Sequence, residues 1–159
     1  VGVVATSAKI AYWQENLDEA CRRLDYAAMA AAWKAENPRL GTVGCVALDA
    51  QGQLAAATST GGTGQCYPGR VGDTPVIGAG TYCTPRVGVS LTGVGERILV
   101  KLAAKRLADL VGDGTPLAEA ARRVLEDVGP GAGLIALGAD GEPSELRNTP
   151  FMATARRPS

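Results

Sequence analysis

The sequence predicts an α+β fold in which helices cover an antiparallel sheet. The predicted elements follow the order helix, strands, two helices and a last strand, without regular alternation of strand and helix. Such an order favours an antiparallel sheet over a doubly wound parallel one. The turn at residues 49–52 (DAQG) also joins two apolar runs into a hairpin. With 159 residues, the chain is long enough for one domain with its own core.

The first predicted element is a helix that begins after Asn16. Apolar residues recur at i, i+3 and i+4 spacing from Leu17 to Ala31. Asn16 and Glu19, three residues apart, resemble a capping box. The pattern therefore predicts a helix that runs to about Ala35, and Pro38 excludes its continuation.

A polar linker, residues 35–41, leads from this helix into the hairpin. Residues 42–48 are apolar and partly β-branched, and residues 54–58 are expected to return as their antiparallel partner. Residues 58–80 are rich in glycine. Because glycine lets a backbone approach other groups closely, we expect a functional loop in this stretch.

The remaining elements follow as strands, amphipathic helices and a final strand. The expected ranges are strands at residues 77–83 and 86–91, helices at 96–110 and 117–128, and a strand at 133–139. Thr115-Pro116 suits the start of the second helix because proline is favoured at the first helical position. Asp140-Gly141 is expected to turn the chain toward a frayed basic tail at Arg156-Arg157.

The composition excludes several classes of function. Lys+Arg and Asp+Glu both number 16, so the chain lacks the basic excess typical of nucleic-acid binders. Its apolar runs are shorter than the roughly 20 residues of a membrane span. The absence of histidine excludes Ser-His-Asp and Cys-His catalysis and removes the commonest zinc ligand. We therefore expect neither nucleic acid nor membrane as a partner.

The cysteines predict neither a metal site nor a redox motif. Cys21, Cys45, Cys66 and Cys83 form no C-x-x-C pair, so we expect free and mostly buried thiols. No signal-peptide pattern opens the chain. A reducing cytoplasm is accordingly the expected compartment.

Thr42 has two interpretations. One is a β-branched residue that begins a strand. In the other, cleavage of the Gly41-Thr42 bond makes Thr42 N-terminal, and its α-amine then serves as the base for its own hydroxyl. An ordinary α-amine titrates at about pH 8, which makes it a usable base without any histidine. Gly41 fits the second interpretation because a residue without Cβ tolerates the strained backbone that such cleavage requires.

Several motifs then carry a family resemblance, in the right order and at compatible spacing. They are LGTVGCVALDAQGQLAAATSTGG, PGRVGDTPVIGAGTYC, SLTGVGE and, more faintly, NTPFM. Together they resemble the β subunit of plant-type L-asparaginases, or isoaspartyl aminopeptidases, within the N-terminal nucleophile hydrolases. The resemblance implies the αββα sandwich of that superfamily. It also implies that residues 1–41 are the end of an α portion and residues 42–159 the catalytic half.

The resemblance assigns roles to individual residues. Thr42 matches the nucleophile and, with Gly41, the site of autocatalytic cleavage. Thr60 matches the threonine that supports the nucleophile by hydrogen bonding. Thr92 and Gly93 match the oxyanion hole. In addition, Arg70 and Asp73 match the pair that grips the α-carboxylate and α-amine of the substrate, roles that suit a guanidinium and a carboxylate.

The implied activity is hydrolysis of β-aspartyl amides, with L-asparagine or isoaspartyl dipeptides as small-molecule substrates. The resemblance implies no cofactor; a structural sodium ion occurs in the family, but the loop that binds it is not in this chain. The family's α portion is far longer than the 41 residues here. The chain is therefore either a fragment of a longer precursor or a short natural relative, and we expect the missing α half or a homo-oligomer as partner.

Two other functions are compatible with parts of the sequence. A non-catalytic remnant would stay uncleaved and serve as a binding or assembly module, as the short α portion suggests. A threonine-dependent amidase for a different substrate class would keep the mechanism and change the pocket. The glycines are also compatible with a phosphate-binding loop, but the absence of G-x-x-x-x-G-K-[ST] argues strongly against that interpretation.

Overall fold

The computed structural model describes residues 41–63 and 69–157. The helix predicted from residue 16 to residue 35 lies outside these residues, as do Cys21 and Cys66. The chain divides into two compact units. One unit comprises Val1–Gly41 and Gly61–Val71, and the other, called the sandwich unit below, comprises Thr42–Thr60 and Gly72–Ser159. The described helices and strands all belong to the sandwich unit.

The predicted hairpin is confirmed. Strands β1 (Thr42–Leu48) and β2 (Leu54–Thr60) pair antiparallel, with Thr42 opposite Thr60 and Gly44 opposite Thr58. At the turn, the Asp49 carboxylate accepts the backbone N–H of Gln51 at 2.9 Å and that of Gln53 at 2.7 Å. Gly52 has φ 79°, which glycine adopts without strain. The turn thus fixes the register that pairs the first residue of β1 with the last residue of β2.

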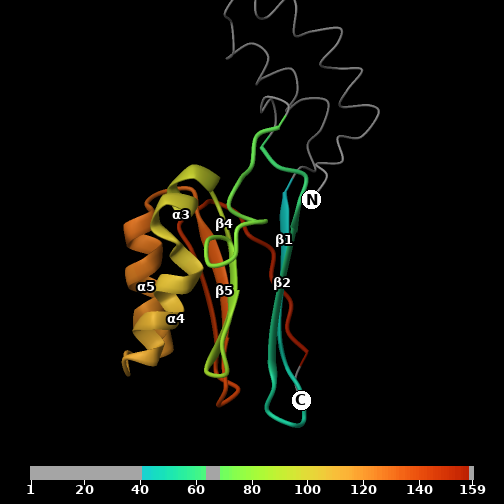
Figure 1. Cartoon of the computed structure of the whole chain (residues 1–159), viewed down its shortest axis with the longest axis vertical. Helices are drawn as coiled ribbons and strands as arrows, with labels where there is room; N and C mark the ends of the chain where they lie inside the picture. The colour runs from blue at the N-terminus through green and yellow to red at the C-terminus, as the bar shows by residue number, and fades with distance from the viewer. Residues whose placement is uncertain (1–40, 64–68, 158–159) are drawn as a thin grey trace, which may run out of the picture. The chain divides into compact units, whose positions relative to one another are not determined.

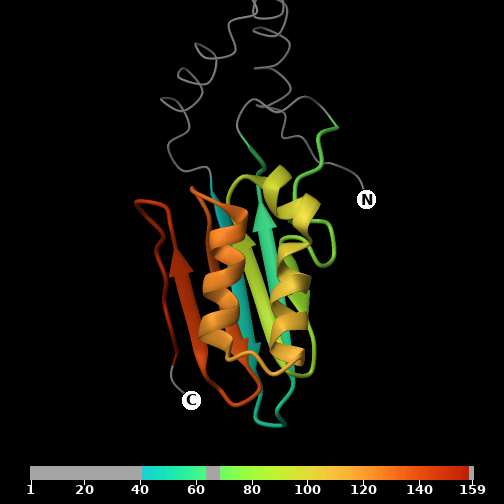
Figure 2. The ribbon, with the colours of Figure 1, turned by 90° about the vertical axis from the view of Figure 1, so that its left-hand side faces the viewer.

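A larger antiparallel sheet lies beside the hairpin (Figure 1). Its strands, in spatial order, are β3 (Thr81–Cys83), β4 (Val87–Thr92), β5 (Gly133–Gly138) and β6 (Pro143–Arg147). Helices α3 (Gly95–Lys101), α4 (Ala103–Gly112) and α5 (Leu117–Val128) cover the face of this sheet that turns away from the hairpin (Figures 1 and 2). The arrangement agrees with an α+β class built on antiparallel sheets.

The core lies between the large sheet and the helices. Alternate residues of β4 point to this side, and Val87, Val89 and Leu91 are fully buried or nearly so. Their buried partners on the other elements are Ile98, Leu107, Ala120, Val124, Leu134 and Ala136. The intervening β4 residues point toward the hairpin, so β4 is covered on both faces.

The single helix predicted over residues 96–110 is wrong, because the chain breaks it at Leu102. This residue has φ 45°, which ends α3 and begins α4. The first turn of α4 then donates its backbone N–H groups to the preceding loop, Ala104 to Ala79 at 3.0 Å and Lys105 to Gly78 at 2.8 Å. Long-range hydrogen bonds therefore outweigh the unfavourable left-handed conformation of a leucine.

The strand predicted over residues 77–83 is shorter than expected. Only Thr81–Cys83 forms a strand, since the chain turns at Gly78, where φ is 89°. Within this turn, the N–H of Gly78 binds the Thr81 carbonyl at 2.9 Å. The residues assigned to the start of the strand instead form the loop that caps α4.

The sequence predicts no strand directly after the turn at Asp140-Gly141. The frayed tail predicted at Arg156-Arg157 lies further along the chain, where residues 151–157 form neither helix nor strand. The turn exists, with Asp140 Oδ1 accepting the N–H of Glu142 at 3.0 Å, but β6 follows it as an edge strand. Pro143 is the first residue of β6, a position that tolerates the missing N–H. The thiols that the structure describes, Cys45 and Cys83, are exposed and free, not buried as predicted. In β1, Cys45 occupies the face that turns away from the large sheet.

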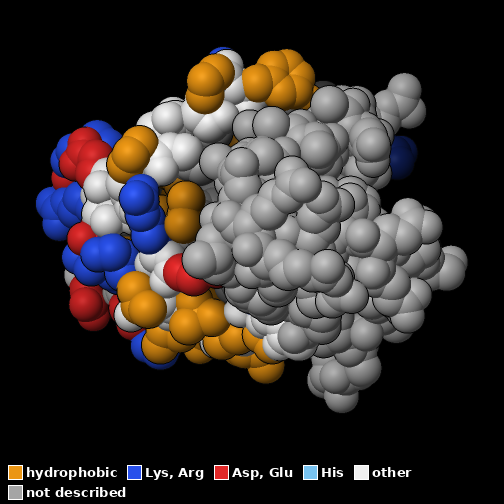
Figure 3. Space-filling model, turned by 90° about the horizontal axis from the view of Figure 1, so that it is seen from above, with side chains coloured by type: hydrophobic (Ala, Val, Ile, Leu, Met, Phe, Trp, Pro, Cys, Tyr) orange, Lys and Arg blue, Asp and Glu red, His pale blue; other side chains and the backbone are white. Residues whose placement is uncertain are grey.

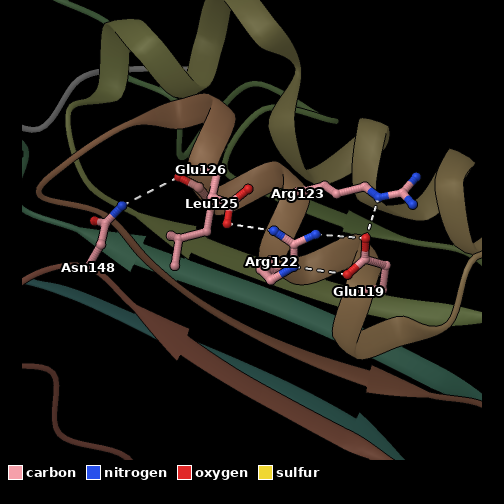
Figure 4. Close-up of polar contacts among 6 residues, drawn as sticks. All are labelled: Glu119, Arg122, Arg123, Leu125, Glu126 and Asn148. Carbon is pink, nitrogen blue, oxygen red and sulfur yellow. Dashed lines mark hydrogen bonds and ion pairs between the residues drawn. The ribbon is translucent and has the colours of Figure 1, made fainter.

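The outer face of α5 is a charged, solvated surface (Figure 4). Glu119 accepts hydrogen bonds from Arg122 at 2.8 and 2.9 Å and from Arg123 at 2.7 Å. These bonds lower the pKa of Glu119 to about 2. Glu126 accepts a further bond from Arg122 at 2.6 Å. Such i, i+3 and i, i+4 pairs support the helix and leave its opposite face to the core.

Candidate active site

Thr42 and Thr60 lie side by side at the open end of the hairpin, opposite its turn. The Thr42 hydroxyl donates a hydrogen bond to the Thr60 hydroxyl, with 3.3 Å between the oxygens. The two residues are direct cross-strand neighbours, so their side chains share one face of the hairpin. The pair is accessible, since Thr42 is half-buried and Thr60 exposed.

Thr92 and Gly93 reach the same end of the sandwich unit from the large sheet. The contact between Ser90 and Thr58, whose hydroxyl oxygens lie 2.7 Å apart, shows how β4 is aligned with β2. Thr58 precedes Thr60 by two residues, and Ser90 precedes Thr92 by two. Since Ala55 and Gly88, near the starts of β2 and β4, also approach one another, these strands run in the same direction and end together. Figure 3 views this end, where exposed apolar side chains lie beside charged ones on the described surface.

The position of Gly93 requires glycine. A Cβ added there would lie 2.9 Å from the Ala132 Cβ and 3.0 Å from its Cα. The first distance is shorter than real Cβ contacts, and the second is tighter than most of them. Gly93 follows directly on β4 and precedes α3, so its backbone is held between the sheet and the loop at residues 129–132. The peptide that would form the oxyanion hole is consequently packed against a neighbouring loop.

Asn148 is a residue that the sequence reasoning missed. Its side-chain oxygen accepts the N–H of Ala132 at 2.7 Å, and its amide nitrogen donates to the Gly129 carbonyl at 2.8 Å. The same nitrogen donates to the Leu125 carbonyl at 3.4 Å (Figure 4). Its backbone N–H also donates to the Ala132 carbonyl at 2.9 Å. The side chain thus holds the loop that packs against Gly93. The NTPFM motif that contains Asn148 carried only a faint resemblance and no assigned role.

We expect Asn148→Ala to lower the free energy of unfolding by about 2–3 kcal/mol, because it removes the side-chain bonds and leaves the Ala132 N–H and the Gly129 carbonyl without this partner. Thr149→Ala is the matched control. The Thr149 hydroxyl bonds only within its own exposed segment, to Phe151, so its loss should stay within about 0.5 kcal/mol. Urea unfolding measures both variants, and equal losses would contradict a specific role for Asn148.

Asp73 lies at the same end of the large sheet. Asp73 is 8% exposed, and its backbone carbonyl accepts the N–H groups of Val76 and Gly80, both at 3.1 Å. A Cβ at Gly80 would come within 2.6 Å of Asp73 Oδ2, so glycine makes room for the carboxylate. Gly80 in turn accepts the N–H of Leu91 at 2.8 Å. Through Gly80, the Asp73 carboxylate is held beside the last residues of β4.

The sandwich unit therefore brings Thr42, Thr60, Thr92, Gly93 and Asp73 to one end. Arg70 and Gly41 belong to the other unit. The roles that the resemblance assigns to all of these residues stay predictions. The described residues contain no cluster of three or more His, Cys, Asp or Glu side chains suited to a metal ion. In the same part of the chain, no helix has the length and apolar character needed to cross a membrane.

Comparison with known proteins adds independent findings. A family profile described as asparaginase matches residues 2–158. An isoaspartyl peptidase of Escherichia coli K12 is 47% identical over 126 residues, which is 76% of this chain and 39% of the relative. An isoaspartyl peptidase/L-asparaginase of Synechocystis is 43% identical over 73% of this chain and 35% of the relative. A plant-type L-asparaginase of Pyrobaculum calidifontis is 46% identical over 70% and 40%, respectively. The chain thus spans less than half the length of each of these relatives.

Proposed function

Because the chain belongs to the asparaginase family, we propose that it is the nucleophile-bearing half of an amidohydrolase that cleaves β-aspartyl amides. L-Asparagine would give aspartate and ammonia, and an isoaspartyl dipeptide would give aspartate and an amino acid. The names of the relatives, isoaspartyl peptidase and L-asparaginase, support both substrates. The observation that carries the proposal is the 3.3 Å hydrogen bond between Thr42 and Thr60 at an accessible sheet end.

The proposed fold is the αββα sandwich of N-terminal nucleophile hydrolases. Helices, large sheet and hairpin supply three successive layers in the described residues, in the order α, β, β. The fourth layer would cover the outward face of the hairpin. That face is apolar and exposed, with Val43, Cys45, Ala47, Ala55 and Ala57. A surface of this kind favours association, which supports a missing α half, or a second copy of the chain, as the partner.

The proposed reaction starts with cleavage of the Gly41-Thr42 bond. In the uncleaved chain the Thr42 nitrogen belongs to a peptide, so it is no base until that bond breaks. The freed α-amine then takes the proton of the Thr42 hydroxyl, while the Thr60 hydroxyl, which accepts from Thr42 in the uncleaved chain, holds the nucleophile in place. This arrangement needs no histidine, and the chain has none.

Two chemical steps follow. The Thr42 oxygen attacks the side-chain carbonyl of the substrate, and the Thr92 hydroxyl and Gly93 N–H stabilise the negative charge that develops on the carbonyl oxygen. The α-ammonium of Thr42 returns its proton to the leaving amine, and a β-aspartyl ester forms on Thr42. Water, deprotonated by the same amine, then hydrolyses the ester and restores the threonine.

The substrate's own charges would be matched by Arg70 and Asp73. A guanidinium binds a carboxylate through two parallel hydrogen bonds, and a carboxylate binds an ammonium. The location of Asp73 beside the end of β4 supports its part in this pair. We place the reaction in the cytoplasm, since the exposed free thiols Cys45 and Cys83 fit a reducing compartment.

The direct test is the intact mass of the purified chain, followed over days at neutral pH. We expect two fragments that separate between Gly41 and Thr42, together with release of aspartate and ammonia from asparagine. The chain should be assayed alone and with the N-terminal part of a relative added as the missing half. A single uncleaved mass with no activity in either mixture would contradict the proposal and favour a non-catalytic binding module.

Arg70→Ala tests the substrate class. For a zwitterionic substrate, KM for asparagine should rise at least about tenfold, because a charged hydrogen-bonded contact is lost. Arg86→Ala is the control, since Arg86 instead binds the carbonyl of Gly112 at the end of α4. An unchanged KM in Arg70→Ala, with hydrolysis intact, would point to an amidase for neutral substrates.

A further inference from the structure

A cluster of hydroxyl groups joins the hairpin to the large sheet. Thr58 on β2, Thr81 on β3 and Ser90 on β4 form this hydroxyl cluster. The Thr58 and Ser90 oxygens lie 2.7 Å apart, and the Thr81 hydroxyl donates to that of Thr58. Sheets usually pack through apolar side chains. Here the contact between the two sheets includes directional hydrogen bonds from three different strands.

Gly44 lets the two sheets approach each other at this cluster. A Cβ on Gly44 would lie 2.2 Å from Ser90 Oγ and 2.9 Å from Ser90 Cβ. The serine thus fills the space above the glycine, and Ser90 is only 3% exposed. Because Gly44 also pairs with Thr58 across the hairpin, Ser90 contacts both strands of the hairpin at one level.

The hydroxyl cluster lies close to the candidate active site along both β2 and β4. Thr58 is two residues before Thr60, and Ser90 is two residues before Thr92. Side chains two residues apart on a strand point to the same face, about 7 Å from one another. The hydroxyl cluster therefore lies one step below Thr60 and Thr92, on the faces from which those threonines project.

We propose that the hydroxyl cluster is a positioning element, which sets the separation and register between the nucleophile on the hairpin and the oxyanion hole on β4. The inference rests on the proposed function, because it assigns Thr42 and Thr92 to those roles. Nucleophilic attack needs the reacting atoms within about 3–3.5 Å, and a 1 Å displacement costs roughly 100-fold in rate. Hydrogen bonds hold their donor and acceptor within a narrow range of distance and angle, so the hydroxyl cluster adds a directional restraint on the separation and register of the two sheets.

Thr58→Val tests the proposal, because valine keeps the branched shape of threonine and removes its hydroxyl. We expect kcat for asparagine to fall at least tenfold while KM stays within about twofold, since Arg70 and Asp73 are not altered. Thr58→Ser, which keeps the hydroxyl, should restore at least half of the wild-type kcat. Ser144→Ala is the control for loss of a buried hydroxyl: Ser144 lies in the large sheet, on β6, and is 7% exposed. It should leave both constants unchanged.

A second readout does not depend on activity. Amide hydrogen exchange should accelerate at least tenfold at Thr60 and Thr92 in Thr58→Val, but not at Leu107 or Val124 in the helices. A wild-type protein that is inactive both alone and with the added N-terminal part of a relative would contradict the proposed function, and the exchange pattern alone would then decide on the positioning element. Unchanged kcat and exchange in Thr58→Val would overturn the inference. So would a Thr58→Ser variant as slow as Thr58→Val, or exchange accelerated equally throughout the unit.

Discussion

Thr42→Ala is expected to leave the Gly41-Thr42 bond intact and to reduce hydrolysis of asparagine and isoaspartyl dipeptides to background. The loss should be on the order of 10⁴-fold or more, as for other essential nucleophiles. The physical reason is that one residue supplies two groups. Its hydroxyl is the nucleophile in both reactions, and its α-amine becomes available as a base only after cleavage. Intact mass and release of aspartate measure the two effects on the same sample.

Two further variants separate chemistry from folding. Thr42→Ser keeps the hydroxyl and should still cleave and hydrolyse, although more slowly. Ser59→Ala changes an exposed neighbour of Thr60 on β2 and should have no effect on either reaction. Because Thr42 is not fully buried, Thr42→Ala should unfold at the wild-type temperature. Hydrolysis retained by Thr42→Ala would refute the assignment of the nucleophile.

The parts of the fold that the sequence predicted are those with local causes. The hairpin depends on Asp49 and Gly52 at its turn and on the apolar runs on either side, and α5 depends on its own periodicity and Pro116. The break at Leu102 has no local cause. The N–H groups of Ala104 and Lys105, which follow the break, bind the carbonyls of Ala79 and Gly78, more than 20 residues earlier in the chain. No propensity or spacing within residues 96–110 indicates such bonds.

The same division applies to the candidate site. Motifs in sequence order located Thr42, Thr60 and Thr92, and the structure places these residues at one end of the sandwich unit. Ser90 and Asn148 escaped notice because their significance lies in contacts with distant segments, Ser90 with Thr58 and Asn148 with the loop after α5. From the sequence alone, a serine and an asparagine at these positions resemble ordinary strand and turn residues. The predicted role of Arg70 in binding the substrate still depends on the motif alone.

The second large effect is expected from a substitution at Gly44, which lies in close contact with Ser90. Gly44→Ala would place a methyl group 2.2 Å from Ser90 Oγ, so the hairpin must move away from the large sheet. Overpacking of this kind should cost about 3 kcal/mol of stability. The displacement should also separate Thr42 from Thr92, so kcat should fall by roughly 100-fold for a 1 Å shift. Thermal unfolding and steady-state kinetics measure the two losses.

A second substitution, at Ser90, shows whether the defect of Gly44→Ala comes from the clash with Ser90 or from the absence of glycine at residue 44. Ser90→Gly, added to Gly44→Ala, removes both atoms that would clash with the methyl group and should recover much of the lost stability. It should not recover kcat, because the hydrogen bond between Ser90 and Thr58 is gone as well. Gly112→Ala is the matched control: a Cβ there meets no atom within 4 Å, and alanine favours the end of α4 by up to about 1 kcal/mol. If Gly44→Ala proved as harmless as Gly112→Ala, the two sheets would be free to separate, and the close contact between hairpin and β4 could not be what aligns the threonines.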